Sequence, residues 1–128
     1  MTSHTSHVGK TVLVVDDSPD IRELLGMLLG MSGCRVVEAE NGQRAVDLAP
    51  QINPDLILMD LSMPVLDGYE ATRRLKAQPE SSGIPVVAVS AFCDARNRQK
   101  ALDAGCEECV CKPVDFGLLD GLLSKHLH

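Results

Sequence analysis

Short, nearly continuous apolar runs constrain the fold of this chain more than any other feature. The runs VLVV, LILM and VVAV each place four apolar residues in a row between polar or turn-forming residues. A run of this kind is typical of a strand buried on both faces, as in a parallel sheet that helices cover on either side. Strands are predicted at residues 11–15, 35–39, 55–59, 85–90 and 108–111.

Helical patterns follow each of these runs. The first helix is predicted to begin near Pro19 and to end at Gly33, and Asn41 is predicted to cap a short helix that runs to Leu48 and is terminated by Pro50. Further helices are predicted at residues 67–77 and 94–104 and from Asp115 onward. The strict alternation predicts an α/β fold, an open (βα)5 sandwich with ligands bound beyond the carboxyl ends of its strands.

Length and composition set the broad class. The 128 residues fit one domain, predicted at residues 10–128 after a loose polar tail at residues 1–9. The formal charge of −6 argues against direct nucleic-acid binding, and no apolar run approaches the ~20 residues that cross a membrane. The odd number of cysteines, five, is more typical of a reducing compartment, so the cytoplasm is the expected location. The histidines, which lie near the termini, are expected to be solvated.

Polar residues collect where the predicted strands end. Asp16 and Asp17 follow the first run, Asp60 the third, Ser90 ends the fourth, and Lys112 follows the fifth. A parallel sheet brings all of them to one edge. Three carboxylates there repel, at roughly 4 kcal/mol per pair for a separation of ~4 Å and an effective dielectric constant near 20. Hard oxygen ligands without clustered histidines favour Mg²⁺ as the compensating charge.

A carboxylate beside such an ion can act as a nucleophile toward phosphorus and form an aspartyl phosphate. A lysine ammonium would stabilise charge on the phosphoryl oxygens, and a serine hydroxyl would donate a hydrogen bond to the product. Asp60, Lys112 and Ser90 fill these three roles in the predicted crevice.

Four segments together resemble the receiver domain of two-component response regulators, over residues 10–127. They are VLVVDDSPD, LILMDLSMPVLDGYE, VVAVSA and CVCKPVD. The resemblance implies a flavodoxin-like, doubly wound sheet in the order 2-1-3-4-5. It implies a chemotaxis-type single-domain receiver in which Asp60 accepts a phosphoryl group from a histidine kinase or a histidine phosphotransfer protein.

The resemblance also implies a role for each residue of the site. Asp17, Asp60 and the backbone carbonyl of Ser62 would hold Mg²⁺ or Mn²⁺, with Asp16 acting through water. Lys112 would pair with the phosphoryl group, Ser90 would move toward it on activation, and the Lys112–Pro113 peptide would be cis. A downstream protein would bind the face made of the fourth helix, fifth strand and fifth helix, and a homodimer is left open.

One position departs from the family pattern, and another lies where members of the family often tune dephosphorylation. Cys109 replaces the usual aromatic residue three positions before Lys112, which puts relay through an aromatic ring in doubt. Phe92, two residues beyond Ser90, is bulky, and the hypothesis is that it slows hydrolysis of the phosphoryl group.

Several alternatives stay open at this point. The cluster of Cys106, Cys109 and Cys111 suggests zinc or redox chemistry, but buried small hydrophobic side chains are the favoured interpretation because a structural zinc site needs a fourth ligand. For the whole chain, one alternative is a receiver-like interaction scaffold that does not switch. Another is a Mg²⁺-dependent phosphohydrolase, although the D-x-D pattern expected for the common type is missing.

Overall fold

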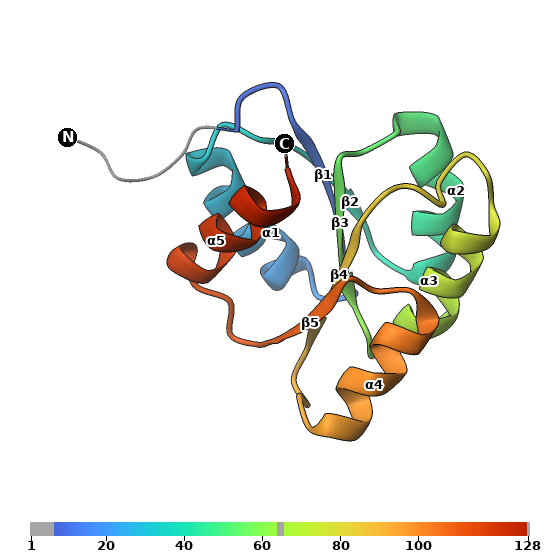
Figure 1. Cartoon of the computed structure of the whole chain (residues 1–128). Coiled ribbons are helices and arrows are strands. Elements are labelled where there is room, and N and C mark those ends of the chain that lie inside the picture. The colour runs from blue at the N-terminus through green and yellow to red at the C-terminus, as the bar shows by residue number, and fades with distance from the viewer. Residues whose placement is uncertain (1–6, 64–65, 128) are drawn as a thin grey trace.

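Five strands and five helices alternate along the chain in the computed structural model, which describes residues 7–63 and 66–127 (Figure 1). The strands are β1 (Thr11–Val15), β2 (Arg35–Ala39), β3 (Leu56–Asp60), β4 (Val86–Ser90) and β5 (Glu108–Cys111). The helices are α1 (Pro19–Met31), α2 (Gly42–Ile52), α3 (Gly68–Ala77), α4 (Ala95–Ala104) and α5 (Phe116–His126). All strand pairs are parallel, in the order β2-β1-β3-β4-β5, which confirms the predicted fold class.

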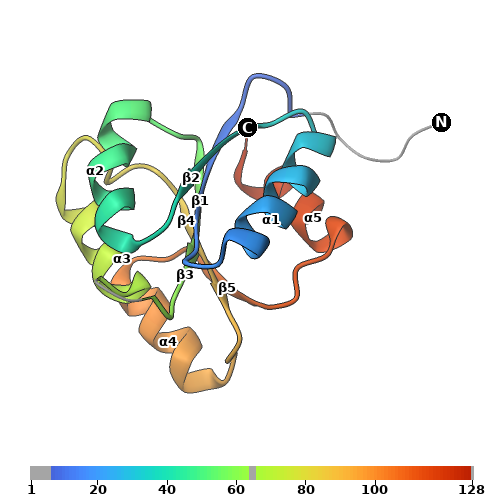
Figure 2. The ribbon, with the colours of Figure 1, turned by 180° about the vertical axis from the view of Figure 1, so that it is seen from behind.

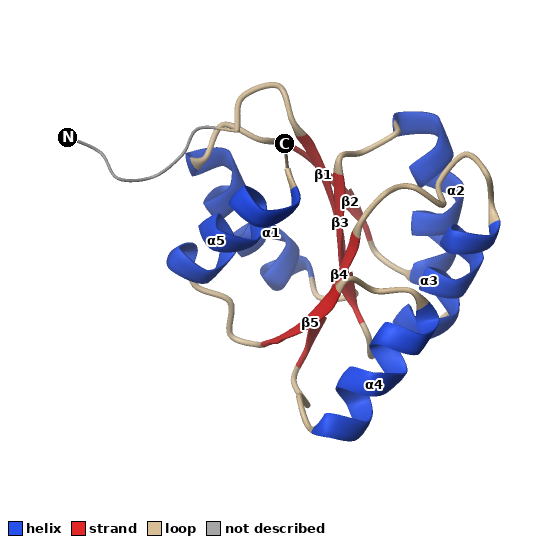
Figure 3. Cartoon of the chain, in the orientation of Figure 1, coloured by secondary structure: helices blue, strands red, loops and turns tan. Residues whose placement is uncertain are grey.

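The helices form two layers around the sheet. Helices α1 and α5 cover one face, and α2, α3 and α4 cover the other (Figures 2 and 3). Alternate residues of β1 serve the two layers: Val12 and Val14 belong to the core under α1 and α5, whereas Leu13 and Val15 belong to the opposite core. The continuous apolar run of a central strand therefore reflects burial on both of its faces.

Side-chain caps fix where the helices begin. The hydroxyl of Ser18 accepts a hydrogen bond from the Ile21 amide, and the carboxylates of Asp67, Asp94 and Asp115 each accept one from the amide three residues later. Such caps satisfy amides that the first helical turn leaves without a partner. Because each of these helices follows the loop that leaves the carboxyl end of a strand, the caps also shape the loops at that edge of the sheet.

The predicted end of α2 was wrong. The helix does not stop before Pro50 but continues to Ile52 and is closed by Asn53, whose left-handed backbone lets its amide donate to Ala49 at 2.8 Å. Proline removes one amide donor, a loss that falls here in the last turn of the helix. Burial of Ala45 and Ala49 against the sheet holds this turn in place despite that loss.

The segment before β1 only partly tests the predicted tail. Residues 1–6 lie outside the described residues; of residues 7–9, His7 is buried against the domain, while Val8 and Gly9 are exposed. His7 is 6% exposed, its amide donates to the Ser32 carbonyl at 2.7 Å, and its Nε2 lies 3.7 Å from Asp120. The expectation that His7 is solvated was therefore wrong. Of the helices in the described part of the chain, none is long and apolar enough to cross a membrane.

Candidate functional site

Three carboxylates meet at the carboxyl edge of the sheet. Asp16 directly follows β1, Asp17 is next to it, and Asp60 is the last residue of β3. Each offers one oxygen atom, and these oxygens all lie within 4.8 Å of one another. Asp16 and Asp60 are 2% and 4% exposed, while Asp17 faces solvent. The fold has thus placed two buried negative charges and one accessible charge together.

Backbone groups hold the two buried carboxylates in place. The Ser18 amide donates to Oδ1 of Asp16 at 2.9 Å, and the Ser62 amide donates to Oδ1 of Asp60 at 3.2 Å. In each case the amide donor lies two residues after the aspartate, so each carboxylate is held by the loop that follows its own strand. The guanidinium of Arg22 donates to the backbone carbonyl of Asp16 at 2.7 Å and fixes that loop from α1.

Lys112, directly after β5, supplies the positive charge in the crevice. Its Nζ donates to Oδ2 of Asp16 at 3.1 Å and lies 3.5 Å from Oδ1 of Asp60. Burial would lower the pKa of Lys112, but its hydrogen bond to Asp16 and the charge of Asp60 outweigh burial and raise it. Lys112 is therefore a fixed cation whose side chain is 26% exposed.

Asp60 remains electrostatically uncompensated despite this lysine. Burial raises the pKa of Asp60 and the negative charge of Asp16 raises it further, against the smaller lowering effects of the Ser62 amide and Lys112. A single ammonium thus does not balance three carboxylates. The hard oxygen donors and their spacing fit a divalent ion of the Mg²⁺ class, which binds through one or two carboxylates and keeps several waters.

Ser90 lies at the same edge, but its hydroxyl bonds to its own loop. Its Oγ donates to the Phe92 carbonyl at 2.9 Å and accepts from the Phe92 amide at 3.0 Å. Ser90 is buried, whereas the Phe92 side chain is 68% exposed. The structure therefore unites Asp16, Asp17, Asp60 and Lys112, with Ser90 directed into the loop between β4 and α4.

Comparison with known proteins agrees with this geometry. The family model of the response regulator receiver domain matches residues 12–123. The chain belongs to the response regulator receiver family. Receiver domains of this family are regulatory parts of two-component signalling systems.

Two curated proteins illustrate how this receiver domain relates to longer and shorter relatives. The polar-differentiation response regulator DivK of Brucella anthropi is 38% identical over 105 residues, which cover 82% of this chain and 85% of DivK. The phosphate regulon transcriptional regulatory protein PhoB of Pseudomonas aeruginosa is 39% identical over 106 residues, which cover 83% of this chain. The match spans 46% of PhoB, less than half of that protein.

Solved structures share the fold over nearly the whole receiver domain. The chemotaxis protein CheY4 of Vibrio cholerae has a TM-score of 0.87 at 27% identity and covers 92% of this chain and 98% of its own. The receiver domain of the sensor histidine kinase PA1611 from Pseudomonas aeruginosa has a TM-score of 0.86 at 34% identity, with 93% and 98% covered. That PA1611 structure has a magnesium ion coordinated in its active site cleft.

The cysteines of this receiver domain correct part of the sequence interpretation. Cys106 and Cys109 are buried free thiols, as expected of small hydrophobic side chains, and burial raises the pKa of both. Cys111 does not fit that interpretation, because it is exposed and disulfide-bonded to Cys93. Within residues 7–63 and 66–127, the one group of three acidic, cysteine or histidine side chains close enough to bind a metal is the aspartate cluster.

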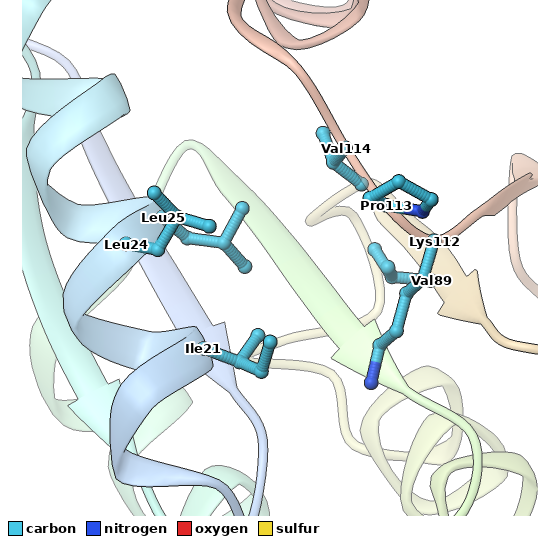
Figure 4. A pocket seen from close by; sticks show the side chains of 7 residues that line it. All are labelled: Ile21, Leu24, Leu25, Val89, Lys112, Pro113 and Val114. Carbon is cyan, nitrogen blue, oxygen red and sulfur yellow. The ribbon is translucent and has the colours of Figure 1, made fainter.

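An apolar groove of about 240 Å³ adjoins the site (Figure 4). Side chains of α1 line one wall, and side chains from β4 and the segment after β5 line the other. The lining residues are Ile21, Leu24, Leu25, Val89, Lys112, Pro113 and Val114. The Lys112–Pro113 peptide is cis. Figure 4 shows the Lys112 side chain running past Val89, away from Pro113 and Val114, and its ammonium contacts Asp16 and Asp60, so the groove and the acidic crevice share this lysine.

Two residues that sequence reasoning missed help to shape the site. Gly68, at the start of α3, leaves no room for a side chain, because a Cβ there would overlap the backbone carbonyl oxygen of Asp60 and lie 2.8 Å from Cα of Leu61. Arg22 links the Asp16 loop to Glu38 through a 2.9 Å ion pair. The pair Asp67-Gly68 was a turn signal that could have pointed to the glycine. Nothing in the sequence pattern pointed to Arg22.

Proposed function

We propose that this receiver domain is a phosphoacceptor switch in which Asp60 takes a phosphoryl group from a phosphohistidine donor. The observation that carries the proposal is the position of Asp60, a buried carboxylate at the end of β3, within 4.8 Å of Asp16 and Asp17 and 3.5 Å from Lys112. Burial and the negative charge of Asp16 destabilise the ionised carboxylate, and a bound divalent ion would offset that cost and keep Asp60 ionised as a nucleophile.

The orientation of Asp60 assigns its two oxygens different tasks. The Ser62 amide and the Lys112 ammonium both approach Oδ1, which leaves Oδ2 as the nucleophile. Oδ2 attacks phosphorus, the bond from phosphorus to the donor nitrogen breaks, and the electron pair leaves with the imidazole. Lys112 then stabilises the added negative charge on the phosphoryl oxygens.

The acidic cluster would hold the divalent cofactor of this transfer, Mg²⁺ or Mn²⁺. Asp17, Asp60 and the backbone carbonyl of Ser62 are the proposed ligands, and Asp16, already bonded to Lys112 and the Ser18 amide, would act through water. When bound, the ion supplies charge stabilisation for the transferring phosphoryl oxygens. The oxygen donor set and the exposure of Asp17 support this assignment.

Signalling would follow from movement of Ser90 toward the phosphoryl group. To donate to that group, Ser90 must release the Phe92 carbonyl, and this release would reshape the loop leading into α4. Cys109, buried under α4, would take the place of the usual aromatic relay. The downstream protein would bind the face of α4, β5 and α5; Leu102 of α4 and Leu118 of α5 are exposed. A histidine kinase or phosphotransfer protein as donor would place the domain in the cytoplasm, and formation of a homodimer is left open.

A non-switching interaction scaffold is the second candidate. Two observations favour it: Cys109 replaces the usual aromatic residue, and both hydrogen-bonding roles of the Ser90 hydroxyl are filled within its own loop. The two candidates differ in whether Asp60 is phosphorylated and whether residues around Ser90 respond.

Incubation with acetyl phosphate and Mg²⁺, followed by intact mass measurement, separates these functions. The switch requires a gain of one phosphoryl group that is lost in Asp60→Asn. The matched control is Asp67→Asn, because asparagine caps α3 as well as aspartate does and the loop keeps its other contacts. No gain of mass favours the scaffold, and rapid turnover of phosphate esters favours a phosphohydrolase.

A further inference from the structure

Two cysteines from separate segments meet beside the site. Cys93 lies in the loop between β4 and α4, Cys111 is the last residue of β5, and their sulfurs are bonded across 18 positions of sequence. Their Cα atoms are 5.7 Å apart, which lies within the usual range for a disulfide. The other three cysteines, Cys34, Cys106 and Cys109, are buried free thiols. The pair thus differs from the rest in both position and accessibility.

The disulfide closes a small ring around Ser90. Ser90 and Cys111 are register partners in β4 and β5, and the Lys112 amide donates to the Ser90 carbonyl at 2.8 Å. From Ser90 the chain passes through Phe92 to Cys93 and returns through the two sulfurs to β5. Within this ring the Ser90 hydroxyl is bonded to the Phe92 backbone. A covalent link to β5 therefore restrains the very loop that must move if Ser90 is to leave Phe92.

We infer that Cys93 and Cys111 form a reversible thiol–disulfide site, reduced by an external dithiol, whose oxidised form locks the β4–α4 loop and blocks the movement of Ser90. The regulatory half of this inference rests on the proposed phosphoacceptor function. The existence of the redox site rests only on the bond between the two cysteines and on their position at the surface.

The chemistry needs a dithiol and nothing else. A thiolate of the dithiol attacks one sulfur of the pair, and the other cysteine leaves as a thiolate. The second thiol of the reductant then attacks the reductant's sulfur in the mixed disulfide. This step closes a disulfide within the reductant and releases the remaining cysteine as a thiolate. Two electrons and two protons pass to Cys93 and Cys111, while the dithiol becomes a disulfide. An oxidised dithiol reverses each step.

The surroundings favour reaction at this pair over the buried thiols. Cys111 is exposed and Cys93 is half-buried, so the pair lies at the surface, whereas the three free cysteines are buried. The guanidinium of Arg98 donates to the backbone carbonyls of Cys93 at 3.0 Å and Cys109 at 3.3 Å. After reduction, these hydrogen bonds still link α4 to both segments, but the covalent restraint on the loop is gone.

The redox site itself is tested by equilibrating the protein with mixtures of reduced and oxidised dithiothreitol, alkylating with iodoacetamide and mapping the labelled peptides. We expect Cys93 and Cys111 to become labelled together as the reduced reagent increases, while Cys34 stays unlabelled in the folded protein. Labelling of Cys93 and Cys111 at every ratio, or at none, would overturn the redox site.

The regulatory effect is tested on separately prepared oxidised and reduced protein, with acetyl phosphate and Mg²⁺ as the probe. Backbone amide signals of residues 90–93 are expected to shift on phosphorylation in the reduced protein, in Cys93→Ser and in Cys111→Ser, and to lose that shift in the oxidised protein. The matched control is Cys34→Ala, which removes a thiol but keeps the bond and its redox dependence. One of the two single variants lies in the loop and the other on β5. If one of them fails to fold, the other still tests the proposal.

Equal amide shifts in the oxidised and reduced forms would overturn the regulatory inference. If no form gains a phosphoryl group, the proposed function fails instead. In that case the redox site is judged by the labelling pattern alone, and the lock by whether amide signals of residues 90–93 move on reduction.

Discussion

The ammonium of Lys112 lies 3.5 Å from Oδ1 of Asp60, across the crevice between the ends of β5 and β3. The same ammonium donates to Asp16 at 3.1 Å, so one cation serves two buried carboxylates. Removing one partner of a buried ion pair leaves an uncompensated charge, which costs more than the pair itself contributes. The crevice is thus a place where single substitutions have a large effect on stability.

Substitution of this lysine tests the electrostatic balance. We expect Lys112→Met to lower the free energy of unfolding by about 1–3 kcal/mol in the absence of divalent ions, because Asp16 and Asp60 lose their shared cation. Urea denaturation with a chelator present measures the change. The double variant Lys112→Met with Asp16→Asn should recover part of the loss, and a purely additive result would contradict the coupling.

A divalent ion should stabilise the domain through the same cluster. At a Mg²⁺ concentration of about 100 times its Kd, we expect the free energy of unfolding to rise by about 2.7 kcal/mol. Asp17→Asn should remove most of this rise, whereas Asp20→Asn, an exposed acid in the first turn of α1, should keep it. Thermal melts with and without Mg²⁺ measure the effect, and equal responses of the two variants would exclude Asp17 as a ligand.

Gly68 should tolerate no side chain. Gly68→Ala forces a Cβ against the Asp60 carbonyl oxygen, so the loop after β3 must shift; we expect a loss of about 1–3 kcal/mol in stability together with weaker Mg²⁺ binding. Gly83→Ala is the control, because no atom lies within 4 Å of its Cβ position. Urea denaturation and Mg²⁺ titration of the two variants check this, and intact metal binding in Gly68→Ala would show that the loop adapts.

Much of the fold and the acidic cluster followed from local sequence patterns. Apolar runs such as VLVV reported burial on both faces of a strand, and parallel strands necessarily bring residues such as Asp16 and Asp60 to one edge. Lys112 lies at the same edge because it follows β5, which is also parallel to the other strands. These features depend only on the period and direction of the strands, which sequence encodes well.

The features that sequence reasoning missed depend on tertiary contacts. The bond between Cys93 and Cys111 requires that the loop after β4 pass the end of β5, and no spacing rule states this. Likewise, continuation of α2 past Pro50 depends on burial of its apolar face, which outweighs one missing hydrogen bond. Both features depend on contacts between segments that are distant in the sequence, and local sequence patterns do not encode such contacts.

Phe92 tests the control of phosphoryl lifetime. If its exposed ring hinders an attacking water, Phe92→Ala should hydrolyse the phosphoryl group faster, while the backbone bonds to Ser90 remain. Phe92→Leu, which keeps much of the bulk, should lie nearer to the wild type. Decay of the phosphorylated mass after removal of the donor measures the rate, and an unchanged rate in Phe92→Ala would exclude this role.

Glu108 on β5 makes a pH-dependent contact with α5. Its Oε2 lies 2.7 Å from Nε2 of His126 and accepts from Lys125 at 3.2 Å. Burial raises the pKa of Glu108, but the hydrogen bonds from His126 and Lys125 together outweigh burial, so the pKa lies below the ordinary value. A carboxylate of this kind stabilises the folded state above its unfolded pKa, and the stabilisation is lost as the pH falls through the folded pKa.

We therefore expect Glu108→Gln to lower the free energy of unfolding by about 0.5 kcal/mol at neutral pH, in the range of partly exposed ion pairs. The difference from the wild type should shrink as the pH falls below the ordinary glutamate pKa of about 4.3 and vanish below the folded value. Glu40→Gln, at an exposed position after β2, provides the control and should show no such pH dependence. Urea denaturation across the acidic range measures both variants. A difference that stays constant with pH would show that the Glu108 contact does not depend on its charge.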